Sequence, residues 1–357
     1  MRCKPGVVIP ACLASHNLSP PITTSSDPVQ GSFPDMKDPI QKAWVDTFRT
    51  LQLKSNQDPT FGESIGAYTS PCSIAASKER SYSGVAYYSP AKDRPNLHLI
   101  TAAHVEKIVF TEDSTHGDAV ASGVQFLHHG ISTFVKARKE VLLSSGVFGY
   151  ENHYVGENLQ DHVFCGSSFE VNDGVKTMVV VRDPAIRDAG LKQYKESRMG
   201  PFAHGPSYSF AHVPLNAHEP VQPPTTEVLK RGITEFFDDF PSAKLQYRFI
   251  QRMTESPVEA TTTHFLARHP ANYISTLAML SHPFSRGHVQ IKSVNLQEPP
   301  TIDFKYMSHP LDGEIYGRHM MFHDDLVRTE PLASLLKPNG KRLPPGKIQL
   351  RWKVPLS

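Results

Sequence analysis

Proline is the residue that most limits what this chain can fold into. It occupies 30 of the 357 positions and is accompanied by 22 glycines. Because proline lacks a backbone donor and is excluded from helix interiors, this content predicts many loops and short elements in place of long helices. Seven of the prolines lie within residues 1–39, which we expect to be extended or loosely attached.

Length and charge predict a folded chain that does not recruit nucleic acid. At roughly 150 residues per domain, 357 residues predict two domains with room for one large core. Hydrophobic residues make up 39% of the chain and charged residues 20%, a balance that argues against disorder. Lys and Arg number 37 against 35 Asp and Glu, so the formal charge is only +2 and no net field attracts nucleic acid or an anionic membrane.

The sequence predicts neither a membrane span nor a disulfide framework. No apolar run approaches the ~20 residues that a transmembrane helix needs. Arg2 and Lys4 precede a short apolar run in the order of a signal peptide, but Pro10 interrupts that run. The location is therefore left open between secretion and the cytoplasm, and the cytoplasm is favoured. The widely spaced cysteines form no C-x-x-C pair and are expected to be structural thiols: Cys3, Cys12, Cys72 and Cys165.

Hydrophobic periodicity predicts helices separated by β-rich segments. Apolar residues at helical spacing predict a helix over 40–53, with Asp38 as a possible cap. The run Val141–Ser144 is nearly all apolar, so we expect its strand to enter a central sheet. Further helices are expected over 80–88, 225–238 and 312–328. Strands are expected over 97–101, 105–110, 121–128, 133–143, 161–171, 245–250, 273–280 and 287–292.

General catalytic motifs are absent, and the histidines give only weak candidates. The sequence contains no G-x-G-x-x-G, P-loop, H-E-x-x-H or G-x-S-x-G motif. His319 and His323 stand four residues apart on a predicted helix, where they could bind a metal or form a solvated or capping pair; the second reading is favoured. We expect His128-His129 to form a hairpin turn. We expect that the Asp161 carboxylate does not orient the His162 imidazole, because neighbouring strand residues point to opposite faces.

The strings that decide the family lie mostly in the middle of the chain. RPNLHLITAAHVEKI at 94–108 resembles a strand pair of the glucose-methanol-choline (GMC) oxidoreductases, and VGENLQDH at 155–162 is nearly identical to the family's V-G-x-N-L-Q-D-H. The other matching strings are RSYSGVAYYSP at 80–90, VKARKEVLLSSG at 135–146, HPFSRGHV at 282–289 and PTIDFKYMSHPLD at 300–312. The chain is therefore identified as a member of this family, similar to its aryl-alcohol oxidase and choline dehydrogenase members.

This resemblance implies a mixed α/β fold (α+β) in which a Rossmann-like FAD domain is interleaved with a substrate domain built on an antiparallel sheet. It also implies oxidation of a small alcohol by hydride transfer to FAD. In the family, the residue at the position of Val105 presents its backbone to the adenine, and the small residues at Ser145 and Gly146 lie against the nucleotide. No metal is implied. The catalytic residues stay unassigned, as do the identity of the alcohol and the oligomeric state.

The same resemblance divides the chain by position. The expected parts are a proline-rich segment at 1–39, a substrate domain at 40–95 and 160–282, a partial FAD domain at 96–159 and 283–335, and a divergent tail at 336–357.

The departures from the family pattern are also informative. The family's glycine-rich pyrophosphate turn and its C-terminal catalytic histidine have no match here, so the sequence resembles a member truncated at both ends. Because the pyrophosphate loses the helix N-terminus and glycine amides that would bind it, we expect FAD to bind weakly or not at all. A non-catalytic remnant, or a cofactor-independent cyclase or dehydratase that uses the substrate-domain pocket, are the alternative functions.

Overall fold

The structure of the protein is a computed structural model. It describes residues 28–34, 38–56, 59, 63, 65–112, 119–144, 155–178, 182–203, 209–217, 244–269, 271–293 and 298–343.

The chain forms two compact units. One consists of Met1–Tyr87, Asp161–Ser285 and Tyr306–Ser357, and the other of Tyr88–Gln160 and Arg286–Lys305. Each unit is assembled from segments far apart in the sequence, so neither can be cut out as one continuous piece. We refer to them as unit 1 and unit 2.

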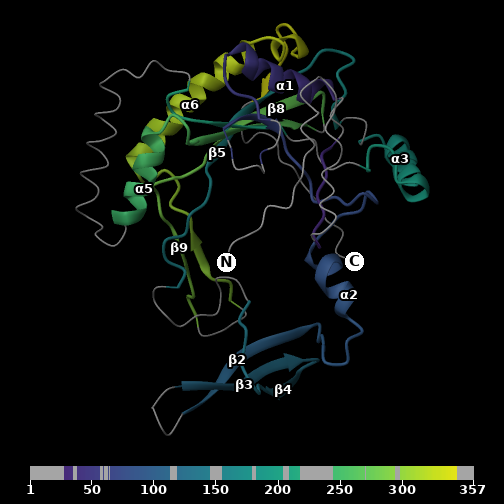
Figure 1. The fold of residues 1–357 in the computed structure, drawn as a ribbon, viewed down its shortest axis with the longest axis vertical. Coiled ribbons are helices and arrows are strands. Elements are labelled where there is room, and N and C mark those ends of the chain that lie inside the picture. Colours follow the sequence, from purple (N-terminus) through teal and green to yellow (C-terminus); the bar gives the residue numbers. More distant parts are fainter. Residues whose placement is uncertain are drawn as a thin grey trace. The chain divides into compact units, whose positions relative to one another are not determined.

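Unit 1 is built on a six-stranded antiparallel sheet with the strand order β1-β6-β7-β8-β5-β11 (Figure 1). Neighbouring strands pair antiparallel in each case, so the sheet needs no helical crossover between parallel strands. Its strands are β1 (Gly66–Thr69), β5 (Phe164–Glu170), β6 (Ser209–Val213), β7 (Thr262–Arg268), β8 (Tyr273–Leu280) and β11 (Arg342–Leu343).

Helix α1 (Pro39–Thr50) begins where the sequence predicts a cap. The Asp38 carboxylate accepts a hydrogen bond of 2.9 Å from the backbone N–H of Ile40, and Pro39 occupies the first turn, where its missing N–H costs nothing. Asp38 also forms an ion pair with Arg268 of β7. The carboxylate therefore both starts the helix and ties it to the sheet.

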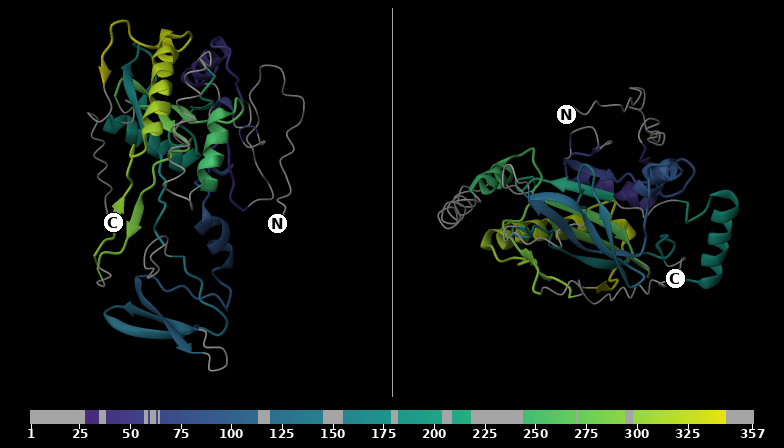
Figure 2. Two further views of the ribbon diagram at one scale, coloured as in Figure 1. Left: turned by 90° about the vertical axis from the view of Figure 1, so that its left-hand side faces the viewer. Right: turned by 90° about the horizontal axis from the view of Figure 1, so that it is seen from below.

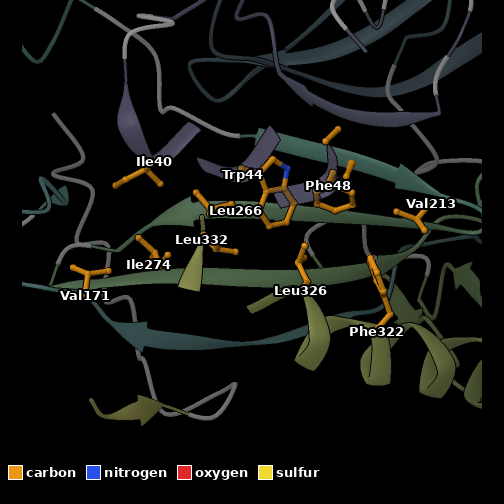
Figure 3. Packing of buried hydrophobic residues seen from close by; sticks show 12 residues of the cluster. Ile40, Trp44, Phe48, Val171, Val213, Leu266, Ile274, Phe322, Leu326 and Leu332 are labelled. Carbon is orange, nitrogen blue, oxygen red and sulfur yellow. The ribbon is translucent and has the colours of Figure 1, made fainter. Parts of the chain in front are cut away.

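Helix α6 (Pro310–Arg328) lies beside α1 on the same face of the sheet. His309 caps it by accepting from the backbone N–H of Leu311, and the rings of Phe48 and Phe322 from the two helices are 6.1 Å apart. The two helices and the strands share one buried cluster (Figure 3). Its labelled members are Ile40, Trp44, Phe48, Val171, Val213, Leu266, Ile274, Phe322, Leu326 and Leu332.

A buried carboxylate fixes the start of α6 to the loop after β8. Asp312 is 1% exposed and accepts hydrogen bonds from the backbone N–H groups of Phe284 (2.7 Å) and Ser285 (2.9 Å). The Ser285 hydroxyl donates to the same carboxylate at 2.5 Å and accepts from the backbone N–H of His309 at 3.0 Å. Two of the family-like strings, 282–289 and 300–312, thus meet at this carboxylate.

Unit 2 contains a three-stranded meander of β2 (Ala103–Glu112), β3 (Ala119–His128) and β4 (Ile131–Lys136), visible in both views of Figure 2. His129 and Gly130 both have positive φ, which a two-residue hairpin turn between right-twisted strands requires. The predicted turn at His128-His129 is confirmed, with its centre one residue further along.

Two glycines bring together family-like strings that are about 130 residues apart in unit 2. The carbonyl oxygen of Gly156 accepts from the N–H of Val289, and Leu159 and Gly287 exchange two backbone hydrogen bonds of 2.8 and 2.9 Å. A Cβ added at Gly156 would lie 1.9 Å from the Val289 oxygen, and one at Gly287 would lie 2.0 Å from the Asp303 oxygen. Only glycine therefore permits this backbone contact, which adjoins the two-stranded sheet of β9 (His288–Gln290) and β10 (Thr301–Asp303).

The other helical segments of the described ranges are a π-helix at Gly84–Tyr88, α2 (Ser89–Ala91), α3 (Pro184–Ser197), α5 (Lys244–Glu255) and a 3₁₀ turn at Ala333–Leu335. None of the helices in the described ranges is long and apolar enough to cross a membrane. Cys72 and Cys165 form no disulfide, and Cys3 and Cys12 lie outside the described residues.

Most expected elements are found, with α1, α6, β5 and β8 near their predicted bounds. The mixed α/β class with antiparallel sheets is confirmed. The expected helix at 225–238 and most of residues 1–39 lie outside the described residues.

Two predicted strands are wrong, and a third is predicted too long. Residues 245–250 form part of α5, because only Tyr247 and Ile250, three positions apart, are buried there, and this is a helical period. Residues 97–101 are irregular, since Leu97 closes a turn onto Arg94 and Ala102 has a φ of 53°. The strand expected over 133–143 ends at Lys136, and Leu142 is 80% exposed, not buried in a central sheet.

We predict that Asp312→Ala destabilises unit 1 by about 3–5 kcal/mol, because three buried donors lose their acceptor at once. Asp312→Asn, which keeps one acceptor, should cost less. Denaturant unfolding followed by the fluorescence of the buried Trp44 measures both. Asp325→Ala, at an exposed position on the same helix, is the control and should change stability by no more than about 0.5 kcal/mol. Equal effects at 312 and 325 would contradict the prediction.

Candidate functional site

The six-stranded sheet of unit 1 has two chemically different faces. Helices α1, α5 and α6 bury apolar side chains against one face, which carries Ala211 and Leu266. Because successive residues of a strand alternate between faces, Phe210 and Phe265 turn to the opposite side. We call this second side the aromatic face; the residues that define it are Tyr68, Phe164, Phe210, His212, Thr263 and Phe265.

Four aromatic rings form a continuous row across the aromatic face. Tyr68 stacks on Phe210 with ring centroids 6.0 Å apart, Phe210 lies 5.8 Å from Phe265, and Phe265 lies 6.3 Å from Phe164. The rings come from β1, β6, β7 and β5, so the row crosses most of the sheet. Phe164 at one end is 59% exposed, whereas Tyr68 at the other is 8% exposed. Such a row can stack against a flat apolar group.

A chain of hydrogen bonds begins at the Tyr68 end of this row. The Tyr68 hydroxyl lies 2.7 Å from Nε2 of His212, whose Nδ1 lies 2.9 Å from Oγ1 of Thr263. Thr263 Oγ1 in turn lies 3.1 Å from Oγ of Ser281, just after β8. Both nitrogens of His212 therefore have a partner, and four hydroxyl or imidazole groups are linked across the sheet.

The surroundings keep His212 neutral near pH 7. Burial lowers the pKa of His212, and the neighbouring His282 lowers it further. The pKa of His282 is itself lowered, first by burial and then by His162, while Glu259 acts in the opposite direction. Burial raises the pKa of the Tyr68 hydroxyl. Tyrosine and neutral imidazole can each both donate and accept, so the chain has no fixed direction.

Asp161 and His162 lie immediately before β5, not within it. The Asp161 carboxylate accepts from the backbone N–H of His162 and from the Tyr306 hydroxyl, and that hydroxyl contact is the largest cause of its lowered pKa. The His162 ring points elsewhere, with Nε2 3.1 Å from the carbonyl oxygen of Ser281. The two side chains therefore have different partners, but the predicted reason, opposite faces of one strand, does not apply because neither residue lies in β5.

Val105, predicted to contact the cofactor, lies in β2 at one edge of the meander in unit 2, and its side chain is 52% exposed. The pairing with β3 skips Glu106, because Val105 pairs with Phe126 and Lys107 with Gln125. This β-bulge is a feature common beside binding sites. Ser145 and Gly146, the other predicted cofactor residues, lie outside the described residues, so their approach to Val105 stays a prediction.

The prediction of a solvated pair at His319 and His323 is wrong, because both side chains are buried. Both are 0% exposed and lie between α6 and the sheet, where His319 Nε2 is 2.8 Å from the Thr261 hydroxyl and His323 Nε2 is 2.8 Å from the Thr276 hydroxyl. The ring of His264 on β7 lies 5.7 and 6.3 Å from theirs. In the described ranges no group of three or more His, Cys, Asp or Glu residues could hold a metal ion.

Sequence reasoning missed Tyr68 and His212, because neither β1 nor β6 was predicted. The available signal was the alternation in Ser209-Phe210-Ala211-His212-Val213, in which small or aliphatic residues face the helices and larger rings face the other way. Five residues are too few for that pattern to stand out without the neighbouring strands.

Comparison with known proteins gives consistent findings. The sequence model of the family described as GMC oxidoreductase matches residues 29–164. Dehydrogenase mpl7 of Monascus purpureus is 25% identical, over 94% of this chain and 62% of that protein.

Two solved structures share the fold. An FAD-dependent oxidoreductase from Chaetomium thermophilum, in complex with a fragment, has a TM-score of 0.72 at 20% identity and covers 90% of this chain. A fungal aryl-alcohol oxidase also has a TM-score of 0.72, at 19% identity and the same coverage. In both cases 59% of the other chain is covered. The chain thus spans about three fifths of the length of these relatives.

We predict that His323 makes unit 1 sensitive to acid. Burial lowers the pKa of His323 to about 4; Asp324 opposes the shift and Arg342 adds to it. In the unfolded chain a histidine titrates near 6.5, so the folded state should lose up to about 3 kcal/mol as the pH falls from about 6.5 to 4, and nothing from this group above 6.5.

The measurement is the free energy of unfolding between pH 7.5 and 4.5. His323→Leu should flatten the pH dependence, since it removes the titrating ring from its buried position. His104→Gln, at an exposed position of β2, is the control and should leave the slope unchanged. A His323→Leu variant with the slope of the original protein would show that another group causes the acid sensitivity.

Proposed function

The chain belongs to the glucose-methanol-choline oxidoreductase family, and from this premise we propose that it binds FAD and oxidises the hydroxyl group of a small aromatic alcohol. The observation that carries the substrate class is the row of four rings on the aromatic face, which ends at a hydroxyl–imidazole pair. The name of one structural neighbour, an aryl-alcohol oxidase, supports the same class.

Two features of unit 2 support the binding of the adenine end of FAD. β2 is an edge strand, so backbone groups along its outer side are not used by the meander, and the bulge at Glu106 displaces the chain beside Val105. We propose that the Val105 backbone meets the adenine, with Ser145 and Gly146 against the nucleotide. Bound FAD would supply the acceptor for the hydride that leaves the carbinol carbon.

Residues of unit 1 would orient the alcohol. Phe210 and Phe265 would stack on its ring, which excludes water from that side, and the Tyr68 hydroxyl would receive the hydroxyl group at the end of the row. Stacking would determine the plane of the substrate ring, and the hydrogen bond to Tyr68 would determine which way the hydroxyl group of the substrate points. Positioning of this kind accounts for much of the rate gain that a binding face can give.

FAD binding is tested by fluorescence titration of the purified chain. We expect weak binding, and we expect Val105→Pro to weaken it about tenfold further, because the adenine loses a backbone donor. Phe134→Pro, at an exposed position of the other edge strand β4 whose N–H points away from β3, is the control and should bind FAD as the original chain does. Far-UV circular dichroism verifies that both variants keep the meander. Identical affinities for the two variants would refute the role of Val105, and the absence of any binding would refute FAD as the cofactor.

The substrate class is tested by the oxidation of benzyl alcohol in the presence of FAD. Phe210→Ala should raise KM about threefold to tenfold with a smaller effect on kcat, since a lost stacking contact is worth about 0.5–1.5 kcal/mol. Phe110→Ala, at an exposed phenylalanine of unit 2, serves as the control. Oxidation of aliphatic alcohols in preference to benzyl alcohol, or equal KM values for the two variants, would refute the proposal that an aromatic alcohol binds on the aromatic face.

A further inference from the structure

We propose that Tyr68, His212, Thr263 and Ser281 form a proton relay, which takes the proton of an alcohol hydroxyl from the aromatic face to the end of β8. This inference rests on the proposed function for the origin of the proton. The relay itself rests on the geometry of unit 1 alone.

The geometry supplies an unbroken path. The links are Tyr68 Oη to His212 Nε2 (2.7 Å), His212 Nδ1 to Thr263 Oγ1 (2.9 Å) and Thr263 Oγ1 to Ser281 Oγ (3.1 Å). All three are within hydrogen-bond range. The four groups come from β1, β6, β7 and the residue after β8, so the antiparallel register of the sheet determines their alignment. Thr263 is 3% exposed, which keeps water from replacing the middle link.

Every member of the path can both give and accept a proton. When an alcohol hydroxyl gives its proton to Tyr68 Oη, the phenol's own proton passes to His212 Nε2 and the Nδ1 proton passes to Thr263. The Thr263 proton passes to Ser281, and the Ser281 proton leaves to water. Each relay group ends with as many protons as it had, and the electron pair of the broken O–H bond stays on the alcohol oxygen. Rotation of the hydroxyls and exchange of the imidazole tautomer reset the path.

The path works only while His212 is neutral, because a protonated imidazole has no nitrogen left to accept. The titratable groups around it favour that state. Burial and His282 lower its pKa, and Tyr68, which faces Nε2 from β1, is itself uncharged below its raised pKa. His162 and Glu259 act on His282 in opposite directions. We therefore expect the relay to operate at neutral pH and to fail when His212 becomes protonated in acid.

The test measures proton exchange between water and the ring N–H of His212 in the full chain labelled with ¹⁵N. Thr263→Val keeps the volume of the side chain but removes the middle link, and should slow this exchange at least tenfold. Thr263→Ser restores a hydroxyl at the same place and should restore the rate. Unchanged exchange in Thr263→Val, or equal slowing in Thr263→Ser, would overturn the relay, because a merely structural role of Thr263 would not depend on its hydroxyl.

A second measurement separates this inference from the proposed function. Binding of benzyl alcohol and of toluene to the same chain is followed by ligand-observed NMR, with Tyr68→Phe as the variant. We expect Tyr68→Phe to weaken the binding of benzyl alcohol severalfold and to leave the affinity for toluene unchanged. If neither compound binds, the aromatic face fails as a substrate site. If both bind equally well to the original chain and to the variant, the face stands and the role of Tyr68 as the entry to the relay is refuted.

Discussion

The burial of α1 and α6 against one face of the six-stranded sheet is the constraint on which the rest of unit 1 depends. Trp44 and Phe48 of one helix and Phe322 and Leu326 of the other fill the same cluster, and the Trp44 indole also donates to the carbonyl oxygen of Phe210. Once these residues determine which side of each strand faces the helices, the alternation along the strands determines which residues lie on the other side. This alternation places the row of four rings and the hydrogen-bonded groups from Tyr68 to Ser281 on the aromatic face.

Several residues of the family-like strings have a structural role in packing and hydrogen bonding. Asp312 and Ser285 satisfy buried donors where α6 meets the loop after β8, and Gly156 and Gly287 allow backbones to approach where no Cβ would fit. These residues therefore have a structural role in the fold, and the resemblance of these strings to the family says less about the reaction.

The elements that could be predicted from the sequence are those with strong local signals. Asp38 before α1, Pro310 at the start of α6 and the His129-Gly130 turn each act through neighbouring residues, and the structure has all three. Within residues 245–250, Leu245, Tyr247 and Phe249 alternate with polar residues, a pattern typical of a strand. Only the packing of Tyr247 and Ile250 against Phe284 and its neighbours shows the helical period.

The resemblance to the glucose-methanol-choline oxidoreductases, the mixed α/β class and the expectation that Val105 contacts the cofactor all follow from local strings of residues. The partners of the histidines follow only from the tertiary structure. His319 and His323 have the spacing of metal ligands, yet they are buried against threonines, whereas His212, which stands in no motif, bridges Tyr68 and Thr263. The physical reason is that the partners of a side chain in an antiparallel sheet lie on neighbouring strands: Thr263 is 51 residues from His212 and Tyr68 is 144. No local pattern encodes a contact across such separations; the register of the strands does.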